Sequence, residues 1–294
     1  MTHFSATQQS FEINGVQIGG QPGDVPTVLI GSIFYHGHKI VSDAKEGHFN
    51  RKKAQQLIET QDQMMEKTGN PCMLDVVIDS KEVLTQYIDF VAETTNCPLL
   101  LDSSVPSIRI AAIDYAEEIG LLSRVVYNSL SPKSTKEELE RLQHLRVEQA
   151  ILLALDPQLV TTSGRIEVIK NSEGNGLVDV AQKCGITKQL VDTCVLDVPS
   201  LGIASKTIME LKDQFGMVCG CGSHNAIETW GGLTTKFRSN LRETGIAAVA
   251  VFATTAGADF ILYGPVDNAN AVFPMVAMVD AAWGQVIFEQ TRKV

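Results

Sequence analysis

The sequence predicts an α/β fold of the (β/α)8 barrel (TIM barrel) type, and three observations support this. Short apolar segments alternate with amphipathic helical segments about eight times, with no linker or low-complexity region between them. These short segments are uniformly hydrophobic, as in parallel strands that are buried on both faces. The length of 294 residues suits one barrel, which usually takes about 250 residues plus additions. A doubly wound open sheet is the alternative, but no glycine fingerprint follows the first strand.

The unit between residues 98 and 129 is the clearest part of this pattern. Residues 98–101 form a short apolar strand, and residues 125–127 form the next one. Between them a helix begins at Pro106, ends at Gly120 and carries one apolar face made by Ile108, Ala111, Ala112, Tyr115, Ala116 and Ile119. Asp102 and Asn128 therefore follow two successive parallel strands, at the end of a barrel where ligands bind. Each residue alone is explained equally well as a turn former or a helix cap.

The elements before this unit begin with a hairpin. Residues 11–18 alternate in polarity and turn at Asn14-Gly15, which predicts a hairpin that caps the base of the barrel within residues 1–26. We treat residues 1–294 as a single domain. The other expected elements up to residue 98 are a strand over 27–34, a long loop, a helix over 50–67, a strand over 72–78 and a helix that Asp79 and Glu82 open as a capping box and that ends near Thr95.

The later elements continue the alternation to the end of the chain. They are a helix capped by Ser134 and Glu137, a strand over 149–155, a helix over 175–184, a strand over 190–196, a helix over 203–215, a strand over 217–220, helical segments over 225–242 and 246–255, a strand over 260–263 and a closing helix over 270–289.

Composition excludes several classes of protein. A net charge of −10 argues against non-specific nucleic-acid binding, which needs a basic surface. No apolar run reaches the roughly 18 residues of a membrane span, and the first residues lack the basic and apolar regions of a secretion signal. The six cysteines show no C-x-x-C metal spacing and lie mostly in apolar runs, so we expect small buried hydrophobes and a cytoplasmic protein.

The ends of the expected strands are rich in carboxylates and amides. Asp79, Asp102, Asn128, Asp156 and Asn225 follow strands, Asp192 lies within one, and Asp75 lies midway along another. Ionised carboxylates only accept hydrogen bonds, so this set suits a flat heterocycle with several N–H donors on one edge. No lysine is placed for a Schiff base. His36 and His38 suggest a metal-dependent hydrolase, but the later strand ends supply no further histidine, so we expect no metal.

At these residues the sequence resembles a known family. The segments IFYHGHKIV (33–41), PLLLDSSVPSIRIAAIDYAEEIGL (98–121), RVVYNS (124–129), VDTCVLDVPSLG (191–202) and CGSHNAIETWG (221–231) resemble the family of the tetrahydromethanopterin S-methyltransferase H subunit. The resemblance covers nearly the whole chain. More distantly, the order Asp102, Asn128, Asp192, Asn225 is similar to that of the pterin-binding barrels, which include corrinoid-dependent methyltetrahydrofolate methyltransferases and dihydropteroate synthase.

This resemblance implies a methyltransferase that moves a methyl group between N5 of a tetrahydropterin and the cobalt of a corrinoid. Asp102, Asn128 and Asp192 would bind the pterin edge, Asn225 would lie beside N5 as the catalytic residue, and Asp75 and Asp156 complete the expected pterin site. The corrinoid would be carried by a partner protein, because the chain lacks a D-x-H-x-x-G motif. We expect tetrahydrofolate as the pterin, with the archaeal tetrahydromethanopterin enzyme as the alternative, and we expect a homodimer.

The proposed chemistry needs few groups from the protein. Methyl transfer is a displacement at carbon, so the protein must mainly position the two partners in line and tune the charge at N5. Three rivals stay open. One is pteroate synthesis, which needs a basic site for a pyrophosphate. The second is a non-catalytic subunit that only docks a corrinoid protein. The third is the metal-dependent hydrolase that uses His36 and His38.

Overall fold

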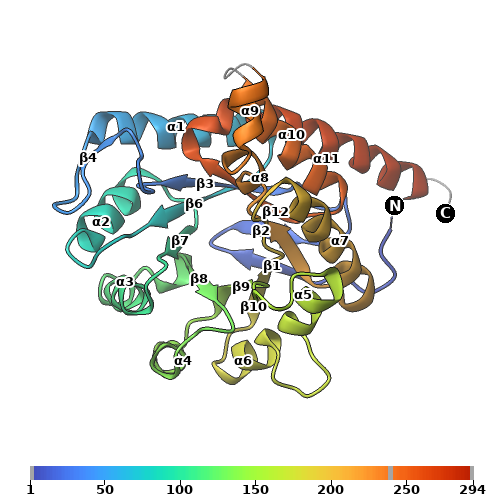
Figure 1. The fold of residues 1–294 in the computed structure, drawn as a ribbon, viewed down its shortest axis with the longest axis horizontal. Helices are drawn as coiled ribbons and strands as arrows, with labels where there is room; N and C mark the ends of the chain where they lie inside the picture. The colour runs from blue at the N-terminus through green and yellow to red at the C-terminus, as the bar shows by residue number, and fades with distance from the viewer. Residues whose placement is uncertain (1–2, 238–240, 292–294) are drawn as a thin grey trace.

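The centre of the molecule is a closed barrel of eight parallel strands, as the sequence predicts (Figure 1). The computed structural model describes residues 3–237 and 241–291. In their order around the barrel the strands are β10 (Lys188–Asp192), β11 (Val218–Cys221), β12 (Phe260–Pro265), β3 (Val28–Ile33), β6 (Cys72–Val77), β7 (Leu99–Asp102), β8 (Val125–Leu130) and β9 (Gln149–Leu153), with β9 pairing again with β10.

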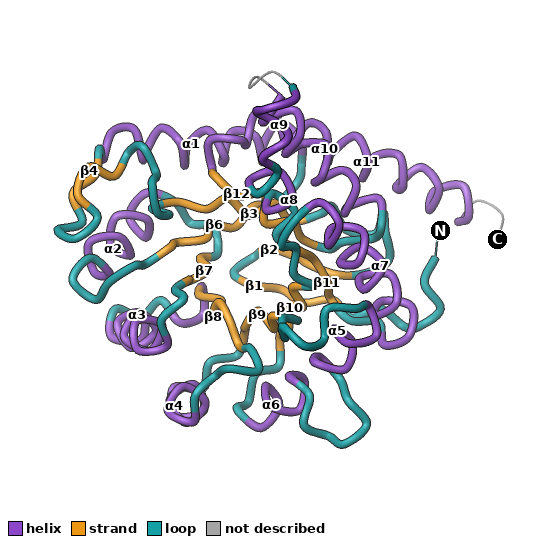
Figure 2. Tube along the Cα trace, viewed as in Figure 1, coloured by secondary structure: helices purple, strands orange, loops and turns teal. Residues whose placement is uncertain are grey.

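Helices surround the ring of strands, and Figure 2 shows the two layers. They are α1 (Arg51–Thr68), α2 (Leu84–Thr94), α3 (Pro106–Glu118), the 3-10 turn η1 (Leu122–Arg124), α4 (Lys136–Leu145), α5 (Thr162–Ile169), α6 (Leu177–Lys183), α7 (Val198–Phe215), α8 (Asn225–Glu228), α9 (Gly231–Lys236), α10 (Arg242–Thr255), the 3-10 turn η3 (Val266–Asn268) and α11 (Ala269–Thr291). Apolar side chains between the two layers form the larger of the two hydrophobic clusters.

An N-terminal hairpin plugs the amino end of the barrel. Strands β1 (Ser10–Ile13) and β2 (Val16–Gly19) pair antiparallel around Asn14 and Gly15, and both lie at the centre of the ring in Figure 1. Ile13 and Ile18 are fully buried in the cluster that fills the barrel interior. Burying each such side chain contributes about 1.5–3 kcal/mol. The predicted hairpin is therefore confirmed, and its apolar face holds it in the barrel.

Strand register brings the predicted polar residues to one end. Asp102 pairs with Asn128 across β7 and β8, and Asp75 pairs with Ser32 across β6 and β3. Asp192 is the last residue of β10, although the sequence placed it within a strand running to residue 196. Because all eight strands are parallel, their carboxyl ends form one mouth of the barrel.

Neither of the two predicted capping boxes is found as predicted. The one on α4 is shifted by one residue, and the one on α2 does not form. The box on α4 joins Thr135 to Glu138, one residue later than predicted, since the Ser134 hydroxyl instead accepts from the Ser131 amide. Asp79 and Glu82 do not open α2. That helix begins at Leu84, after a turn over residues 81–83, and its first turn has no side-chain cap.

Several elements differ from the sequence expectation. The long loop after β3 contains a small antiparallel pair, β4 (Val41–Asp43) and β5 (His48–Phe49). Helix α5 was not expected, and α7 begins at Val198 rather than residue 203. The helical segment expected over 225–242 is divided into α8, α9 and the start of α10, and residues 238–240 of that segment lie outside the described residues.

Helix α11 is more apolar than the sequence prediction allowed. The segment Val266–Glu289 is long and apolar enough by composition to cross a membrane, since an 18-residue stretch of it has a mean hydropathy of 1.6, and only 22% of that stretch is buried. One such helix is weak evidence for a membrane span, because core helices of soluble proteins pass the same test. Here α11 packs against α1 and α10 (Figure 1). Its Val272, Phe273 and Val276 side chains are fully buried.

Candidate active site

A cavity of about 870 Å³ opens at the carboxyl ends of the barrel strands. Five of the six predicted site residues line it, namely Asp75, Asp102, Asn128, Asp192 and Asn225. They come from β6, β7, β8, β10 and α8, and so from most of the way around the ring. A cavity of this size suits a small organic ligand.

Asp75 lies at the centre of a small polar network. Its carboxylate accepts from the Ser32 hydroxyl at 2.8 Å and from Asn128 Nδ2 at 3.2 Å. Burial raises the pKa of Asp75 from its ordinary 3.8 to about 6, while these two hydrogen bonds act in the opposite direction. Because Asn128 donates to Asp75, its amide oxygen is left as an acceptor toward the cavity.

Asp102 and Asp192 keep part of their surface open to the cavity. Burial, followed by the neighbouring Asp75 charge, raises the pKa of Asp102 well above its usual range. Burial also raises the pKa of Asp192 to about 6, although its Oδ1 accepts from the Cys194 amide at 2.7 Å. Helix α3 begins after Val105 with no side-chain cap, so Asp102 is not a helix cap. Its carboxylate is thus available to a ligand.

Asn225 is fixed by a contact that sequence alone does not predict. It is the first residue of α8, and its side chain does not cap that helix. Nδ2 instead donates to the Val195 carbonyl at 3.0 Å, in the loop after β10. A carbonyl can only accept, so the amide must present its nitrogen there and its Oδ1 remains as an acceptor.

The sixth predicted residue, Asp156, does not line the cavity. Strand β9 ends at Leu153, so the chain has already left the barrel mouth where Asp156 lies. Its Oδ1 accepts from the Gln158 amide at 2.8 Å and shapes the local turn. Asp79 is exposed and is also absent from the lining.

The two histidines after β3 are not arranged as a pair of metal ligands. His38 is buried, its Nδ1 accepts from the Phe34 amide at 3.1 Å, and its Nε2 lies 3.3 Å from Asp267 Oδ2. The Tyr35 ring stacks on the His38 ring at 4.3 Å. His36 is exposed at the cavity mouth. Because both nitrogens of His38 face protein groups, the ring holds the loop in place and is not available to bind a metal.

Some residues that line the cavity are not predicted from the sequence. Ser32 is a polar residue inside an otherwise apolar strand, and that signal was available. Glu228 and Arg242 form an ion pair at the mouth, and no local pattern predicts it because the two residues lie 14 positions apart. At the end of β12 the His224 ring lies 2.6 Å from where a Cβ of Gly264 would be, and Gly264 has a φ of +79°, so only glycine fits there.

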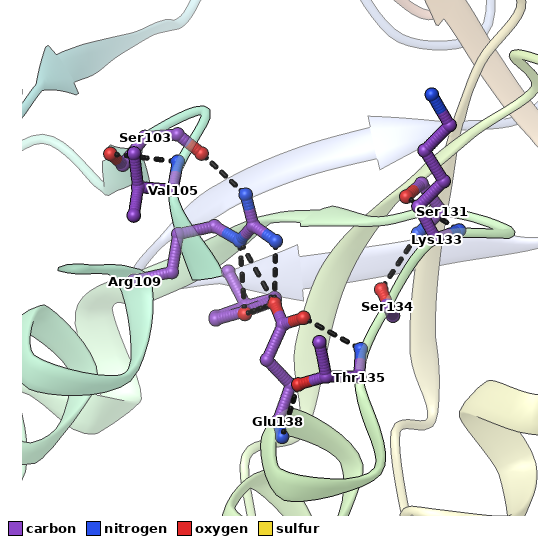
Figure 3. Close-up of polar contacts among 9 residues, drawn as sticks. Ser103, Val105, Arg109, Ser131, Lys133, Ser134, Thr135 and Glu138 are labelled. Carbon is purple, nitrogen blue, oxygen red and sulfur yellow. Dashed lines mark hydrogen bonds and ion pairs between the residues drawn. The ribbon is translucent and has the colours of Figure 1, made fainter. Parts of the chain in front are cut away.

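A buried ion pair fixes the loop that follows Asp102 (Figure 3). Arg109 donates to Glu138 Oε1 at 2.6 Å and to the Ser103 carbonyl, and Glu138 Oε2 accepts from the Thr135 amide at 2.8 Å. The pair therefore joins the segment after β7 to the start of α4. Tyr127, next to Asn128, also donates to Glu138. This network holds the ends of β7 and β8 in fixed positions behind the cavity.

The raised pKa of Asp75 leads to a prediction about stability and pH. Its folded pKa of about 6 lies above its ordinary 3.8, so the folded protein binds the proton more tightly. The corresponding stabilisation is present at low pH and is lost as pH rises to 6 and beyond. We expect Asp75→Asn, which keeps both neighbours hydrogen-bonded, to raise the Tm at about pH 7.5. The difference from the parent should shrink near pH 5, as followed by thermal unfolding. An equal difference at both pH values would contradict this account.

Comparison with known proteins gives consistent matches. The family model described as "Tetrahydromethanopterin S-methyltransferase MtrH subunit" matches residues 6–292. The chain is 36% identical to the tetrahydromethanopterin S-methyltransferase H subunit of Methanopyrus kandleri, covering 93% of this chain and 90% of that protein. It is 37% identical to the corresponding protein of Methanothermobacter thermautotrophicus, covering 95% and 92%.

Solved structures support the fold alone. Dihydropteroate synthase of Yersinia pestis, in a structure with a pterine-sulfa conjugate, superposes with a TM-score of 0.62 at 16% identity, covering 94% of this chain and 98% of that one. The Xanthomonas albilineans dihydropteroate synthase gives a TM-score of 0.54 at 19% identity, with the same coverage of both chains.

Proposed function

Because the chain belongs to the family of the tetrahydromethanopterin S-methyltransferase H subunit, a family of methyltransferase subunits, we propose a specific reaction for its cavity. The protein transfers a methyl group between N5 of a tetrahydropterin and the cobalt of a corrinoid held by a partner protein. The observation that carries the proposal is the convergence of Asp75, Asp102, Asn128, Asp192 and Asn225 on one cavity. The partner follows from the family, whose relatives are named as subunits.

The donors and acceptors of the cavity fit the edge of a pterin. A pterin presents a 2-amino group beside a ring N–H, and an ionised carboxylate can accept from both. Of the three predicted carboxylates that line the cavity, Asp102 and Asp192 keep part of their surface exposed, whereas Asp75 is buried. The Asn128 oxygen adds an acceptor, because its nitrogen is held by Asp75. Asp156 is left out of this proposed site, since it lies outside the cavity lining.

At N5 the proposed role belongs to Asn225. With Nδ2 held by the Val195 carbonyl, Oδ1 accepts a hydrogen bond from a protonated N5. A protonated N5 is the better leaving group, so this contact helps the direction in which the pterin gives up its methyl group. The corrinoid supplies the cobalt that receives or donates the methyl group. No covalent nucleophile of the protein is required, and the side chains position N5 and adjust its charge.

Two candidates remain for the pterin. The names of the relatives support tetrahydromethanopterin, whereas we expect tetrahydrofolate from the sequence alone. We therefore propose tetrahydromethanopterin as the first substrate to test and tetrahydrofolate as the second.

The rival functions have less support from the cavity. Pteroate synthesis needs a basic site for a pyrophosphate, but the ionisable lining is mainly acidic. Among the described lining residues, the acidic members Asp75, Asp102, Asp192, Glu228 and Asp267 outnumber the cations Lys39 and Arg242. Arg242 is moreover paired with Glu228. The metal-dependent hydrolase is disfavoured because both nitrogens of His38 face protein groups.

Calorimetric titration with each tetrahydropterin, followed by a transfer assay, tests the proposal. Methylcobalamin with the unmethylated pterin should give methylpterin, and cob(I)alamin with the methylpterin should give methylcobalamin, both followed by cobalt absorption. Binding of a pterin without transfer in either direction would favour a subunit that only docks a corrinoid protein. If neither pterin binds, the proposed function is wrong.

We also propose a homodimer and a cytoplasmic location. Phe252 on α10 and Met275 and Met278 on α11 are large apolar side chains that are 52%, 42% and 59% exposed. An apolar face of this kind on adjacent helices suits a contact with a second copy. Light scattering of the parent and of Met278→Glu tests the dimer, which the substitution should weaken.

The cysteines support the proposed cytoplasmic location. All six are free thiols, which suits a reducing compartment.

A further inference from the structure

Two cysteines and an aspartate meet at the end of the barrel opposite the cavity. Cys72 is the first residue of β6, Cys97 precedes β7, and Asp62 lies on α1. Their ligand atoms all lie within 4.8 Å of one another. Leu74 pairs with Leu99, so Cys72 and Cys97, each two residues earlier, are neighbours at the amino ends of adjacent strands. The cluster therefore lies far from the carboxyl ends that form the cavity.

The spacing of these atoms fits a tetrahedral zinc site. Zn–S bonds of about 2.3 Å and Zn–O bonds of about 2.1 Å at a tetrahedral angle place a sulfur and an oxygen ligand about 3.6 Å apart. Cys72 Sγ lies 3.7 Å from Asp62 Oδ1. Met65 Sδ also lies 3.7 Å from Cys72 Sγ, so a thioether sulfur, a soft metal ligand, lies beside the two thiols. Thiolate donors select zinc over magnesium or calcium, which prefer oxygen ligands alone.

A positive charge, that of Arg124, lies beside the cluster and offsets part of the negative charge of the three ligands. The Arg124 guanidinium donates to the carbonyls of Cys97 at 2.7 Å and Ala92 at 3.4 Å, and also to that of Thr95. Two thiolates and one carboxylate supply three negative charges, and Zn²⁺ with Arg124 supplies three positive ones. Thr95 Oγ1 lies 3.4 Å from Asp62 Oδ1 and orients this carboxylate as an outer partner of the site.

We propose that Asp62, Cys72 and Cys97 bind one Zn²⁺ ion, with Met65 or a water molecule as the fourth ligand. The ion joins α1, the start of β6 and the segment between α2 and β7. Its role is structural, because it lies at the amino ends of the strands and none of its ligands lines the cavity. The proposal is independent of the methyltransferase function. The sequence alone predicts only buried hydrophobic cysteines here, since the spacing 62, 72 and 97 matches no metal motif.

The test measures metal content of the full chain after chelation, reloading with one equivalent of Zn²⁺ and desalting. The parent should retain about one zinc per chain. Cys97→Ser and Asp62→Asn should each reduce retained zinc at least about 10-fold, since each loses one of three ligands. Cys184→Ser is the matched control, because this buried thiol contacts the Leu139 carbonyl instead. It should retain zinc as the parent does, and reloading with Co²⁺ should give thiolate-to-metal absorption in both.

Unfolding temperatures provide a second measurement. Zinc should raise the Tm of the parent and of Cys184→Ser, and it should not raise that of Cys97→Ser, because only a folded site that binds zinc is stabilised. The proposal fails if the reloaded parent holds no zinc. It also fails if Cys72→Ser/Cys97→Ser retains the metal, or if mass spectrometry of anaerobically purified protein finds a Cys72–Cys97 disulfide. If a cysteine variant does not fold, the Asp62→Asn measurement and the zinc content of the parent still decide.

Discussion

Asn225→Ala should lower the rate of methyl transfer by about 10- to 1000-fold, the cost of losing one preorganised hydrogen-bonding group beside a developing charge. The Asn225 oxygen is fixed in the cavity because its Nδ2 donates to the Val195 carbonyl. The effect should be larger when the methylpterin is the donor, since N5 must then leave as a protonated amine. Single-turnover transfer in both directions, at saturating pterin, measures the effect separately from affinity.

Thr229→Val is a control for distortion of α8. Thr229 Oγ1 donates to the carbonyls of Leu196 and Asn225, so its loss disturbs the same helix and the same loop without removing a cavity group. We expect this variant to transfer at close to the parent rate. If Asn225→Ala lowers pterin affinity but transfers at the parent rate once saturated, Asn225 is only a binding residue, and the mechanism proposed at N5 is wrong.

Asp102→Ala should weaken tetrahydropterin binding by about 1.5–3 kcal/mol, or roughly 10- to 150-fold, the range for a hydrogen bond to a charged group. The pKa of Asp102 is raised in the folded protein, mainly by burial, so its charge costs folding free energy at neutral pH. The substitution should therefore leave the Tm unchanged or raise it near neutral pH. Calorimetric titration and thermal unfolding of the same preparation measure both effects.

Asp79→Ala is the matched control for Asp102, because Asp79 also follows a barrel strand but is exposed and outside the cavity lining. It should bind pterin as the parent does. Unchanged affinity in Asp102→Ala together with a large loss of stability would show that the residue is structural. Binding to the parent should also weaken as pH falls, since Asp102 and Asp192 must be ionised to accept from the pterin and burial raises the pKa of both, that of Asp192 to about 6.

The barrel and much of its mouth could be predicted from the sequence, because they follow from local patterns. Uniform apolar runs between amphipathic helices determine parallel strands. A polar residue directly after such a run then lies at the carboxyl end of the barrel, as Asp102 and Asn128 do. Even here the prediction depends on where a strand ends. Asp156 fails to reach the cavity because β9 ends three residues before it.

Contacts between distant segments were decided by the tertiary structure. Ser32 meets Asp75 across 43 positions, and the Asn225 amide is oriented by Val195, 30 positions away. The zinc site proposed at Asp62, Cys72 and Cys97 likewise exists only where a helix and two strand starts converge. The sequence by itself determined the fold class and some of the residues at the strand ends, such as Asp102 and Asn128, because both depend on local polarity and spacing. The tertiary structure decided which polar atoms remain free to bind a ligand, because that depends on strand register and on hydrogen bonds between remote residues.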